Sequence, residues 1–158
     1  SFVELKKSYN DIRLLLVGGF ERELDPLAED VEDKISKDSF IISVGCQSDV
    51  RPFLVMADVL AFPSYREGFP NVVMQAGAMG LPSIVTDING CNEIIQDGVN
   101  GKIIPPKSEK ALYEAMKWMY EHHKTKVKEM AQRARPIIVE RYEQKKVWEE
   151  LLKEYKRL

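Results

Sequence analysis

The sequence lacks several features by which a class of protein can be recognised. It has two cysteines, Cys46 and Cys91, and two histidines, the adjacent His122 and His123. The cysteines form no CxxC motif, so neither a zinc site nor a disulfide framework is expected. Adjacent residues of a helix point in different directions, so the histidines do not predict a metal pair. We therefore expect no metal site, and two reduced thiols in a cytoplasmic protein.

An excess of one charge and long apolar runs are also absent. The 158 residues include 23 Lys and Arg and 25 Asp and Glu, which gives a net charge of −2. Nucleic-acid-binding domains are usually basic, so no nucleic-acid partner is expected. The sequence shows no apolar run of membrane-spanning length and no recognisable signal peptide. With 44% hydrophobic and 30% charged residues, the composition is typical of one globular domain.

Short apolar runs alternate with helical patterns along most of the chain. The runs that predict strands are residues 12–17, 40–44, 59–62, 83–86 and 102–104. Their apolar residues do not alternate with polar ones, which is typical of parallel strands covered on both faces. Strands that alternate with helices predict an α/β, doubly wound, Rossmann-like fold.

Helical patterns occupy the segments between the strands and the whole C-terminal third. One helix is expected at the start of the chain, and a second of about ten residues from Asp25, with Pro26 in its first position. A third, short helix is expected to be capped by Asp49. A fourth is expected over 71–79, where Gly80 ends it. Residues 108–158 are predicted to be nearly all helix, with a break or kink at Pro136. We expect a single domain over residues 1–158, on which the 108–158 helical tail packs.

The segment from Pro63 to Ala76 is the main candidate for a binding site. It joins a predicted strand to a predicted helix, and open α/β sheets bind ligands at the carboxyl ends of their strands. The free N–H groups of a helix start suit a phosphate, and Gly68 allows the backbone to approach a ligand closely. Glu67 would repel a phosphate, so we expect it to face another part of the ligand, such as sugar hydroxyls. The spacing alone also allows Glu67 merely to complement the helix dipole.

A resemblance to a known family rests on residues 57–106, ADVLAFPSYREGFPNVVMQAGAMGLPSIVTDINGCNEIIQDGVNGKIIPP. This run closely resembles the C-terminal domain of retaining glycosyltransferases with the GT-B fold, the family called family 4 or glycosyl transferases group 1. The family has two glutamates in an E-x7-E motif. Glu67 matches the first glutamate, whereas Gln75 occupies the second position, so the chain has E-x7-Q.

The resemblance implies a role for each matching residue. Glu67 would contact hydroxyls of the donor sugar and orient it, without acting as a nucleophile. Gln75 would bind the ribose hydroxyls, because its amide still accepts and donates hydrogen bonds although it gives no charge-assisted one. Gly45 and Cys46 match the backbone that contacts the nucleobase. The loop and helix start that meet the sugar and the diphosphate are matched by Gly68, Phe69, Pro70, Asn71 and Val72.

The same resemblance implies an activity for the intact protein. It would transfer a hexose from a UDP-sugar to a glycan or lipid-linked acceptor in surface polysaccharide synthesis. The reaction would need no cofactor or metal. Peripheral membrane association of the intact protein is also compatible with this role. Stabilisation of the leaving diphosphate would supply much of the catalysis. Two parts of the family's proteins would precede Ser1. One is the first strand of this domain, with an Arg and a Lys that clamp the diphosphate, and the other is the acceptor-binding domain. We therefore expect the chain alone to be inactive.

The family fold also predicts how the strands are arranged. The order in such sheets is 3-2-1-4-5-6, which makes residues 12–17 the second strand and 59–62 the fourth. The first strand would lie between them. We therefore expect an α/β core that corresponds to the C-terminal half of a GT-B fold, with C-terminal helices. We expect this core to be disturbed between the second and fourth strands, where the first strand is missing.

Two other functions remain compatible with the sequence. A non-catalytic nucleotide-sugar-binding module would explain Gln75 as a sign of lost activity. A sugar-nucleotide epimerase of the same fold should have further titratable residues, yet no His lies near the motif. In the nearby G-x-x-E element, Asn89–Gly90 predicts a turn, and Glu93 is expected to hold its loop together.

Overall fold

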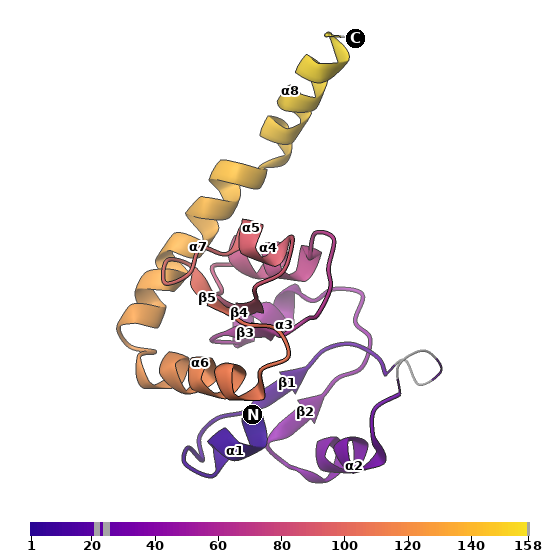
Figure 1. Ribbon diagram of the computed structural model, residues 1–158, viewed down its shortest axis with the longest axis vertical. Helices are drawn as coiled ribbons and strands as arrows, with labels where there is room; N and C mark the ends of the chain where they lie inside the picture. Colours follow the sequence, from indigo (N-terminus) through magenta and orange to yellow (C-terminus); the bar gives the residue numbers. More distant parts are fainter. Residues whose placement is uncertain (21–22, 24–25, 158) are drawn as a thin grey trace. The chain divides into compact units, whose positions relative to one another are not determined.

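A computed structural model describes residues 1–20, 23 and 26–157 of the chain. These residues form two compact units, Ser1–Ala57 and Asp58–Leu158, each with its own parallel sheet (Figure 1). Asp25, with which the second helix was predicted to begin, lies outside the described residues. None of the helices in the described part of the chain is long and apolar enough to cross a membrane.

The first unit contains a small sheet in which β1 and β2 pair in parallel. Its elements in order are α1 (Phe2–Lys6), β1 (Leu14–Leu16), α2 (Glu29–Lys37), β2 (Ile41–Ser43) and α3 (Arg51–Met56). Leu14 pairs with Ile41 and Leu16 with Ser43. Ile42 of β2 is 46% exposed, so the expectation that both faces of every strand are covered is wrong for β2. Helix α2, which packs beside β2, has no buried residue either.

The helices of this unit begin later than the sequence predicted. Pro26 is not the first residue of α2, because α2 begins at Glu29, after Ala28 in extended conformation. Three acidic residues in the first turn, at 29, 30 and 32, favour this start, since they complement the positive end of the helix dipole. In α3, the Asp49 carboxylate accepts a hydrogen bond from the Arg51 backbone N–H at 3.0 Å, although Val50 is the N-cap. The Arg51 guanidinium and this N–H lower the pKa of Asp49 to about 2.

The second unit is built around the sheet β3-β4-β5, whose strands are all parallel. Its elements in order are β3 (Leu60–Phe62), α4 (Asn71–Ala78), β4 (Ser83–Thr86), α5 (Cys91–Ile94), β5 (Gly101–Ile104), α6 (Glu109–Glu121), α7 (Lys126–Tyr142) and α8 (Gln144–Tyr155). Gly80 ends α4 as predicted: its φ is +79°, and its N–H bonds to the Gly77 carbonyl. The Leu81 N–H bonds to the Ala76 carbonyl, which completes a Schellman motif.

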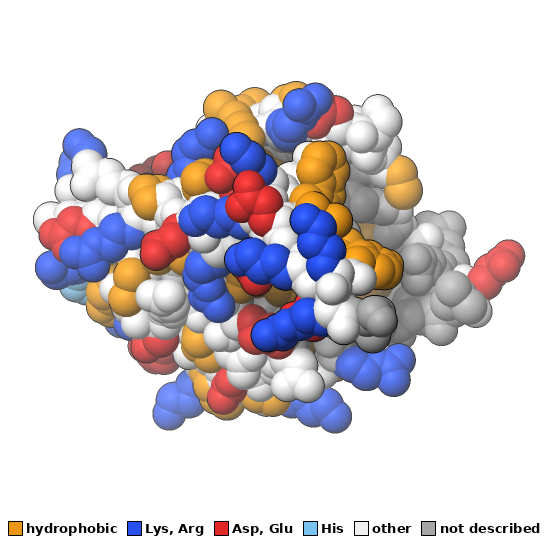
Figure 2. Space-filling view, turned by 90° about the horizontal axis from the view of Figure 1, so that it is seen from above, with side chains coloured by type: hydrophobic (Ala, Val, Ile, Leu, Met, Phe, Trp, Pro, Cys, Tyr) orange, Lys and Arg blue, Asp and Glu red, His pale blue; other side chains and the backbone are white. Residues whose placement is uncertain are grey.

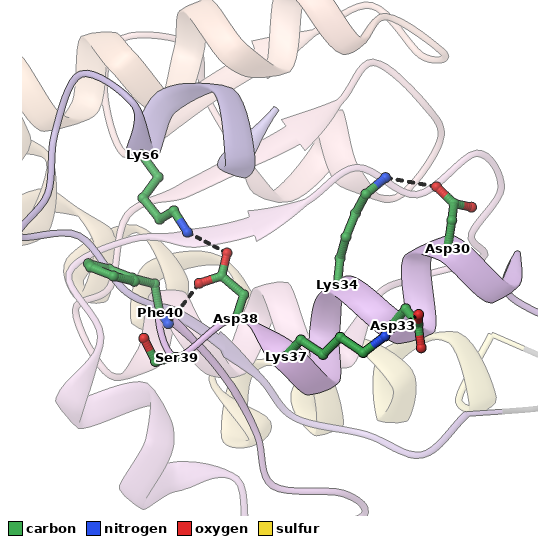
Figure 3. A pocket seen from close by; sticks show the side chains of 8 residues that line it. All are labelled: Lys6, Asp30, Asp33, Lys34, Lys37, Asp38, Ser39 and Phe40. Atoms are coloured by element: carbon green, nitrogen blue, oxygen red, sulfur yellow. Dashed lines mark hydrogen bonds and ion pairs between the residues drawn. The ribbon is translucent and has the colours of Figure 1, made fainter.

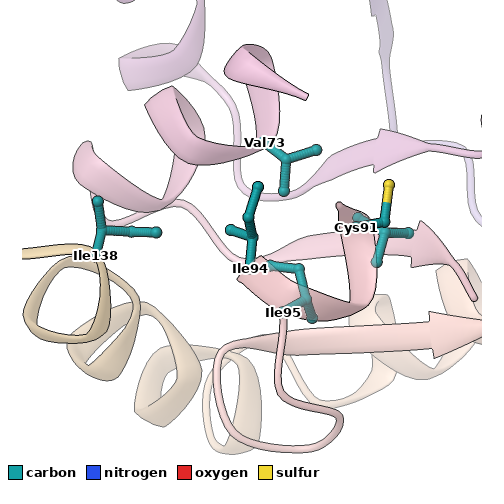
Figure 4. Packing of buried hydrophobic residues seen from close by; sticks show 6 residues of the cluster. Val73, Cys91, Ile94, Ile95 and Ile138 are labelled. Carbon is teal, nitrogen blue, oxygen red and sulfur yellow. The ribbon is translucent and has the colours of Figure 1, made fainter. Parts of the chain in front are cut away.

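The core of the second unit lies on the two faces of β4, whose four residues are all buried. Neighbouring strand residues point to opposite faces, and Val85 accordingly packs in one hydrophobic cluster while Ile84 packs in the other. The first cluster brings α4, α5 and the end of α7 together through Val73, Ile94 and Ile138 (Figure 4). The second cluster consists of Ile84, Ile104, Ala115, Met119, Val127 and Met130.

The C-terminal helices differ in how much they bury. Helix α7 runs through Pro136 without interruption, so of the predicted break or kink, the break is wrong. Contacts with α4 stabilise α7 on both sides of the proline. Before it, Ala134 is fully buried and the Arg135 guanidinium donates to the Ala78 carbonyl at 2.6 Å; after it, Ile138 packs in the cluster of Val73. Helix α8 has no buried residue. Its apolar side chains are exposed, namely Val147, Trp148, Leu151, Leu152 and Tyr155.

The strand pairing agrees with the predicted order. The pair β1-β2 corresponds to positions 2 and 3 of the family sheet, and β3-β4-β5 to positions 4, 5 and 6. Within the described residues, β1 pairs with β2 alone and β3 with β4 alone. In place of the predicted single sheet, the described residues form two, β1-β2 in the first unit and β3-β4-β5 in the second.

The packing of α4 on α7 gives a prediction about stability. A Cβ on Gly77 would lie 2.7 Å from Cγ1 of Ile138, so Gly77→Ala should cost about 1–3 kcal/mol by overpacking, offset by a gain of about 1 kcal/mol in helix propensity. Ile138→Ala should cost about 2–5 kcal/mol, because it leaves a cavity.

In the double variant the new methyl group fills part of that cavity. The two losses in unfolding free energy, measured by urea denaturation, should therefore sum to more than the loss of the double variant. Strictly additive losses would show that these two side chains do not share the space.

Candidate functional site

The loop between β3 and α4 places Glu67 at the carboxyl end of the sheet. The Ser64 hydroxyl donates a hydrogen bond to Oε1 of Glu67 at 2.7 Å. The Thr86 hydroxyl, at the end of β4, donates in turn to the backbone carbonyl of Ser64. Thr86 is buried, whereas Glu67 is partly exposed. The carboxylate is therefore fixed from the ends of two neighbouring strands and can still reach a ligand.

Ser64 is a site residue that the sequence analysis missed. Its position at the end of a predicted strand, three residues before Glu67, is a signal that could have found it. A serine hydroxyl can rotate to serve either a donor or an acceptor, so the sequence alone does not say which partner it takes.

The loop leads directly into the N-terminus of α4. Pro70 is the N-cap residue and is buried, and the helix start has no hydrogen bond from a capping side chain. The first helical residues are Asn71, which is exposed, and Val72, which is partly exposed. An uncapped helix start presents N–H groups and a partial positive charge to an anion. Gly68 and Phe69 are exposed between this helix start and Glu67.

A second loop, between β4 and α5, lies against the first. Gly90 has a φ of +78°, and a Cβ there would lie 2.3 Å from the Gly68 carbonyl oxygen and 2.8 Å from Cδ of Pro70. Only glycine fits such a close approach of two backbones. The Gly90 N–H donates to Oε1 of Glu93 at 3.2 Å, which confirms the prediction that Glu93 holds its own loop together.

Cys91 follows Gly90 and has no exposed surface. Burial raises the pKa of the Cys91 thiol to about 11, and the nearby charge of Glu67 adds to this effect. The thiol therefore stays protonated near neutral pH and is not a nucleophile. Both cysteines are free, and Cys46 is exposed.

The remaining predicted residues lie in two different places. Gln75 is exposed on α4, one turn beyond Asn71. Gly45 and Cys46 belong to the first unit, in the loop after β2. There the Gly45 carbonyl accepts a hydrogen bond from the Gly18 N–H at 2.9 Å, which joins the loops that follow β1 and β2.

The first unit also has an open pocket of about 600 Å³ between α1 and α2 (Figure 3). Its charged side chains pair with one another: Lys6 with Asp38 at 2.5 Å, Lys34 with Asp30 at 2.7 Å, and Lys37 with Asp33 at 2.5 Å. The lining has equal numbers of Lys and Asp, so it favours neither an anion nor a cation, and it includes no predicted site residue.

Charges of both signs are also mixed on the face of the molecule in Figure 2, where positive and negative side chains lie interspersed with apolar ones. Among the described residues, no group of three or more His, Cys, Asp and Glu side chains is placed to hold a metal ion.

Comparisons with known proteins point to one family. A family model described as "Glycosyl transferases group 1" matches residues 1–122. The N,N'-diacetylbacillosaminyl-diphospho-undecaprenol alpha-1,3-N-acetylgalactosaminyltransferase of Campylobacter jejuni is 32% identical over 113 residues, 72% of this chain and 29% of its own length. The capsular polysaccharide biosynthesis glycosyltransferase CapM of Staphylococcus aureus is 26% identical over 147 residues, 93% of this chain and 38% of its own. The chain thus spans less than half the length of these relatives.

A solved structure matches the fold as well. The crystal structure of Anabaena HepE in complex with UDP superposes with a TM-score of 0.84 at 21% identity, over 93% of this chain and 41% of that one. The α/β fold with parallel strands and C-terminal helices is therefore confirmed.

The contact between the two loops gives a prediction with a matched control. Gly90→Ala should lower the unfolding free energy by about 2 kcal/mol or more, because alanine is strained at this φ and its Cβ meets the Gly68 carbonyl. Gly68→Ala meets nothing within 4 Å and has no positive φ, so its effect should stay within about 0.5 kcal/mol. Equal effects of the two substitutions in urea unfolding would mean that the loops do not touch.

Proposed function

This chain belongs to the glycosyl transferases group 1 family, and from that premise we propose that it is the part of a glycosyltransferase that binds the nucleotide-sugar donor. The observation that carries the proposal is the position of Glu67. Its carboxylate is oriented by Ser64 at 2.7 Å, and it lies a short loop before the uncapped start of α4. A donor of this class has an anionic diphosphate and a sugar rich in hydroxyls. The helix start suits the diphosphate, and the carboxylate suits the hydroxyls.

The diphosphate is assigned to the N-terminus of α4. Backbone N–H groups at Asn71 and Val72 belong to the first helical turn, where they have no carbonyl partner within the helix. The helix dipole would stabilise the negative charge that develops on the leaving diphosphate during transfer. Pro70 has no N–H and so contributes shape rather than a hydrogen bond.

The sugar is assigned to Glu67. A carboxylate accepts hydrogen bonds from hydroxyls but repels phosphate, so it is suited to the sugar side of the donor. With one oxygen engaged by Ser64, the carboxylate has a defined orientation. We assign it to orienting the sugar and not to attacking it, in a reaction that retains the anomeric configuration.

The nucleotide is assigned to UDP. Gln75 is exposed one turn along α4 from the proposed diphosphate position. Its amide is assigned to the ribose hydroxyls. Gly45 and Cys46 are the candidates for contact with the base. The complex of HepE with UDP supports this choice of nucleotide.

The acceptor is proposed from the relatives. The Campylobacter jejuni relative is named for an acceptor linked to diphospho-undecaprenol, and the Staphylococcus aureus relative for capsular polysaccharide biosynthesis. We propose that the intact protein acts in the cytoplasm and extends a glycan or lipid-linked acceptor of a surface polysaccharide, without a metal or other cofactor.

Gln75 in place of the family's second glutamate also favours a second candidate, a module that binds the donor without transferring it. Release of the donor sugar by the full-length protein would exclude that candidate.

Removal of the Glu67 carboxylate should separate sugar binding from nucleotide binding. We expect Glu67→Ala in the full-length protein to lower the transfer rate by about 100-fold or more, the usual cost of a preorganised polar group in a catalytic site. The affinity for UDP alone, measured by calorimetry, should stay that of the parent.

The matched control for this substitution is Glu114→Ala, which removes an exposed glutamate of α6. It should leave both transfer and UDP binding unchanged. A Glu67→Ala protein that transfers at the parental rate would rule out the assignment of Glu67 to the sugar.

Gln75→Glu should tighten the binding of UDP. A hydrogen bond to a charged group is stronger than one to an amide, so we expect a gain of about 1 kcal/mol, or about fivefold in Kd. Gln132→Glu, at an exposed position of α7, adds the same charge elsewhere and should have no effect. A large loss of affinity in Gln75→Glu would mean that the site has been rebuilt around the amide.

A further inference from the structure

Tyr142, the last residue of α7, contacts the first loop of the candidate site and the helix α5 that follows the second loop. Its ring packs edge-on against the ring of Phe69, with the ring centroids 5.3 Å apart and the planes at 66°. Its hydroxyl donates a hydrogen bond to the backbone carbonyl of Glu93 at 2.9 Å, across 49 residues of sequence. One side chain from a C-terminal helix therefore touches the loop before α4 and the helix that follows the second loop.

We propose that Tyr142 is a positioning residue that sets the placement of the Glu67–Pro70 loop. The proposal rests on the function proposed above, since that loop is assigned to the donor sugar and diphosphate. Tyr142 itself is not proposed to touch the donor.

The side-chain side of the loop tip is open apart from this contact. The Gly68 carbonyl lies against Gly90, but a Cβ on Gly68 would meet nothing within 4 Å, and Phe69 is 40% exposed. An edge-on aromatic pair contributes about 0.5–1.5 kcal/mol beyond the burial of its surface, which is enough to favour one position of a short loop over others. Ser64 fixes the Glu67 side of the loop, and Tyr142 fixes the Phe69 side.

The hydroxyl group of Tyr142 couples the first loop to the second. By binding the Glu93 carbonyl it anchors α5, and the residue before α5, Gly90, lies against the Gly68 carbonyl. The end of α7 is itself anchored one turn earlier by Ile138, which packs in the same cluster as Val73 of α4. Tyr142 thus connects the two loops to each other and to the end of α7.

A role in stability alone would predict a different pattern of effects. Tyr142 is only partly buried, whereas Ile138 is 6% exposed. Deleting the tyrosine ring should therefore disturb the loop more than the core, and deleting part of Ile138 should do the reverse.

The test compares four variants of the full-length protein by donor kcat/KM, unfolding temperature and hydrogen–deuterium exchange. We expect Tyr142→Leu to lower kcat/KM by about tenfold or more, because a 1 Å misplacement of reacting groups can cost about 100-fold. Tyr142→Phe keeps the ring on Phe69 and should recover most of that loss. Tyr155→Leu, the same substitution at an exposed tyrosine of α8, and Ile138→Val, a core change, should leave kcat/KM near the parental value.

Exchange provides a readout that does not depend on activity. Residues 64–69 and 88–93 should exchange faster in Tyr142→Leu than in the parent, while α6 keeps its protection. Unchanged exchange in both segments, or a kcat/KM in Tyr142→Leu equal to the parent's, would overturn the proposal. If exchange rises as expected but the parent transfers no sugar from any UDP-sugar, the proposed function is wrong and the positioning role of Tyr142 stands.

Discussion

The burial of β4 on both faces is the constraint on which the second unit depends. Ile84 and Val85 are both fully buried, and they point into separate hydrophobic clusters. Every other element of that unit except α8 contributes to covering β4 or the strands beside it. Since apolar burial is the main favourable term in folding, these two clusters fix where β3, β4 and α4 lie. The loops at the carboxyl ends of the strands begin and end on these elements, so the core fixes the two ends of each loop.

The candidate site is connected to the buried strand β4 by hydrogen bonds. Thr86 is the last residue of the buried strand β4, and its hydroxyl fixes the Ser64 carbonyl of the neighbouring loop. Ser64 then orients Glu67, so the one carboxylate of the loop is connected to the core through two hydrogen bonds. A group positioned in this way loses little entropy when it binds a ligand. The proposed binding of a donor sugar depends on this chain of contacts more than on any unusual charge state.

The sequence by itself determined the class of fold, the strands and the position of the motif. The run 83–86 predicts a buried parallel strand because its adjacent apolar residues, Ile84 and Val85, point to opposite faces and both need cover. The end of α4 at Gly80 was predictable, since glycine adopts a left-handed conformation at little cost. The spacing of Glu67 and Gln75 after a strand was likewise visible, because residues on one loop and one helical turn are close in space whatever the rest of the chain does.

Only the tertiary structure decided which distant residues meet. The contact of Tyr142 with Phe69 and the close approach of Gly90 to Gly68 join segments that no local pattern relates. The same holds for α7, which continues through Pro136 although local preference predicts a break. Local signals report the conformational preferences of a few neighbouring residues. A proline in a helix costs about 3 kcal/mol, and the packing against α4 that offsets this cost involves residues that are remote in the sequence.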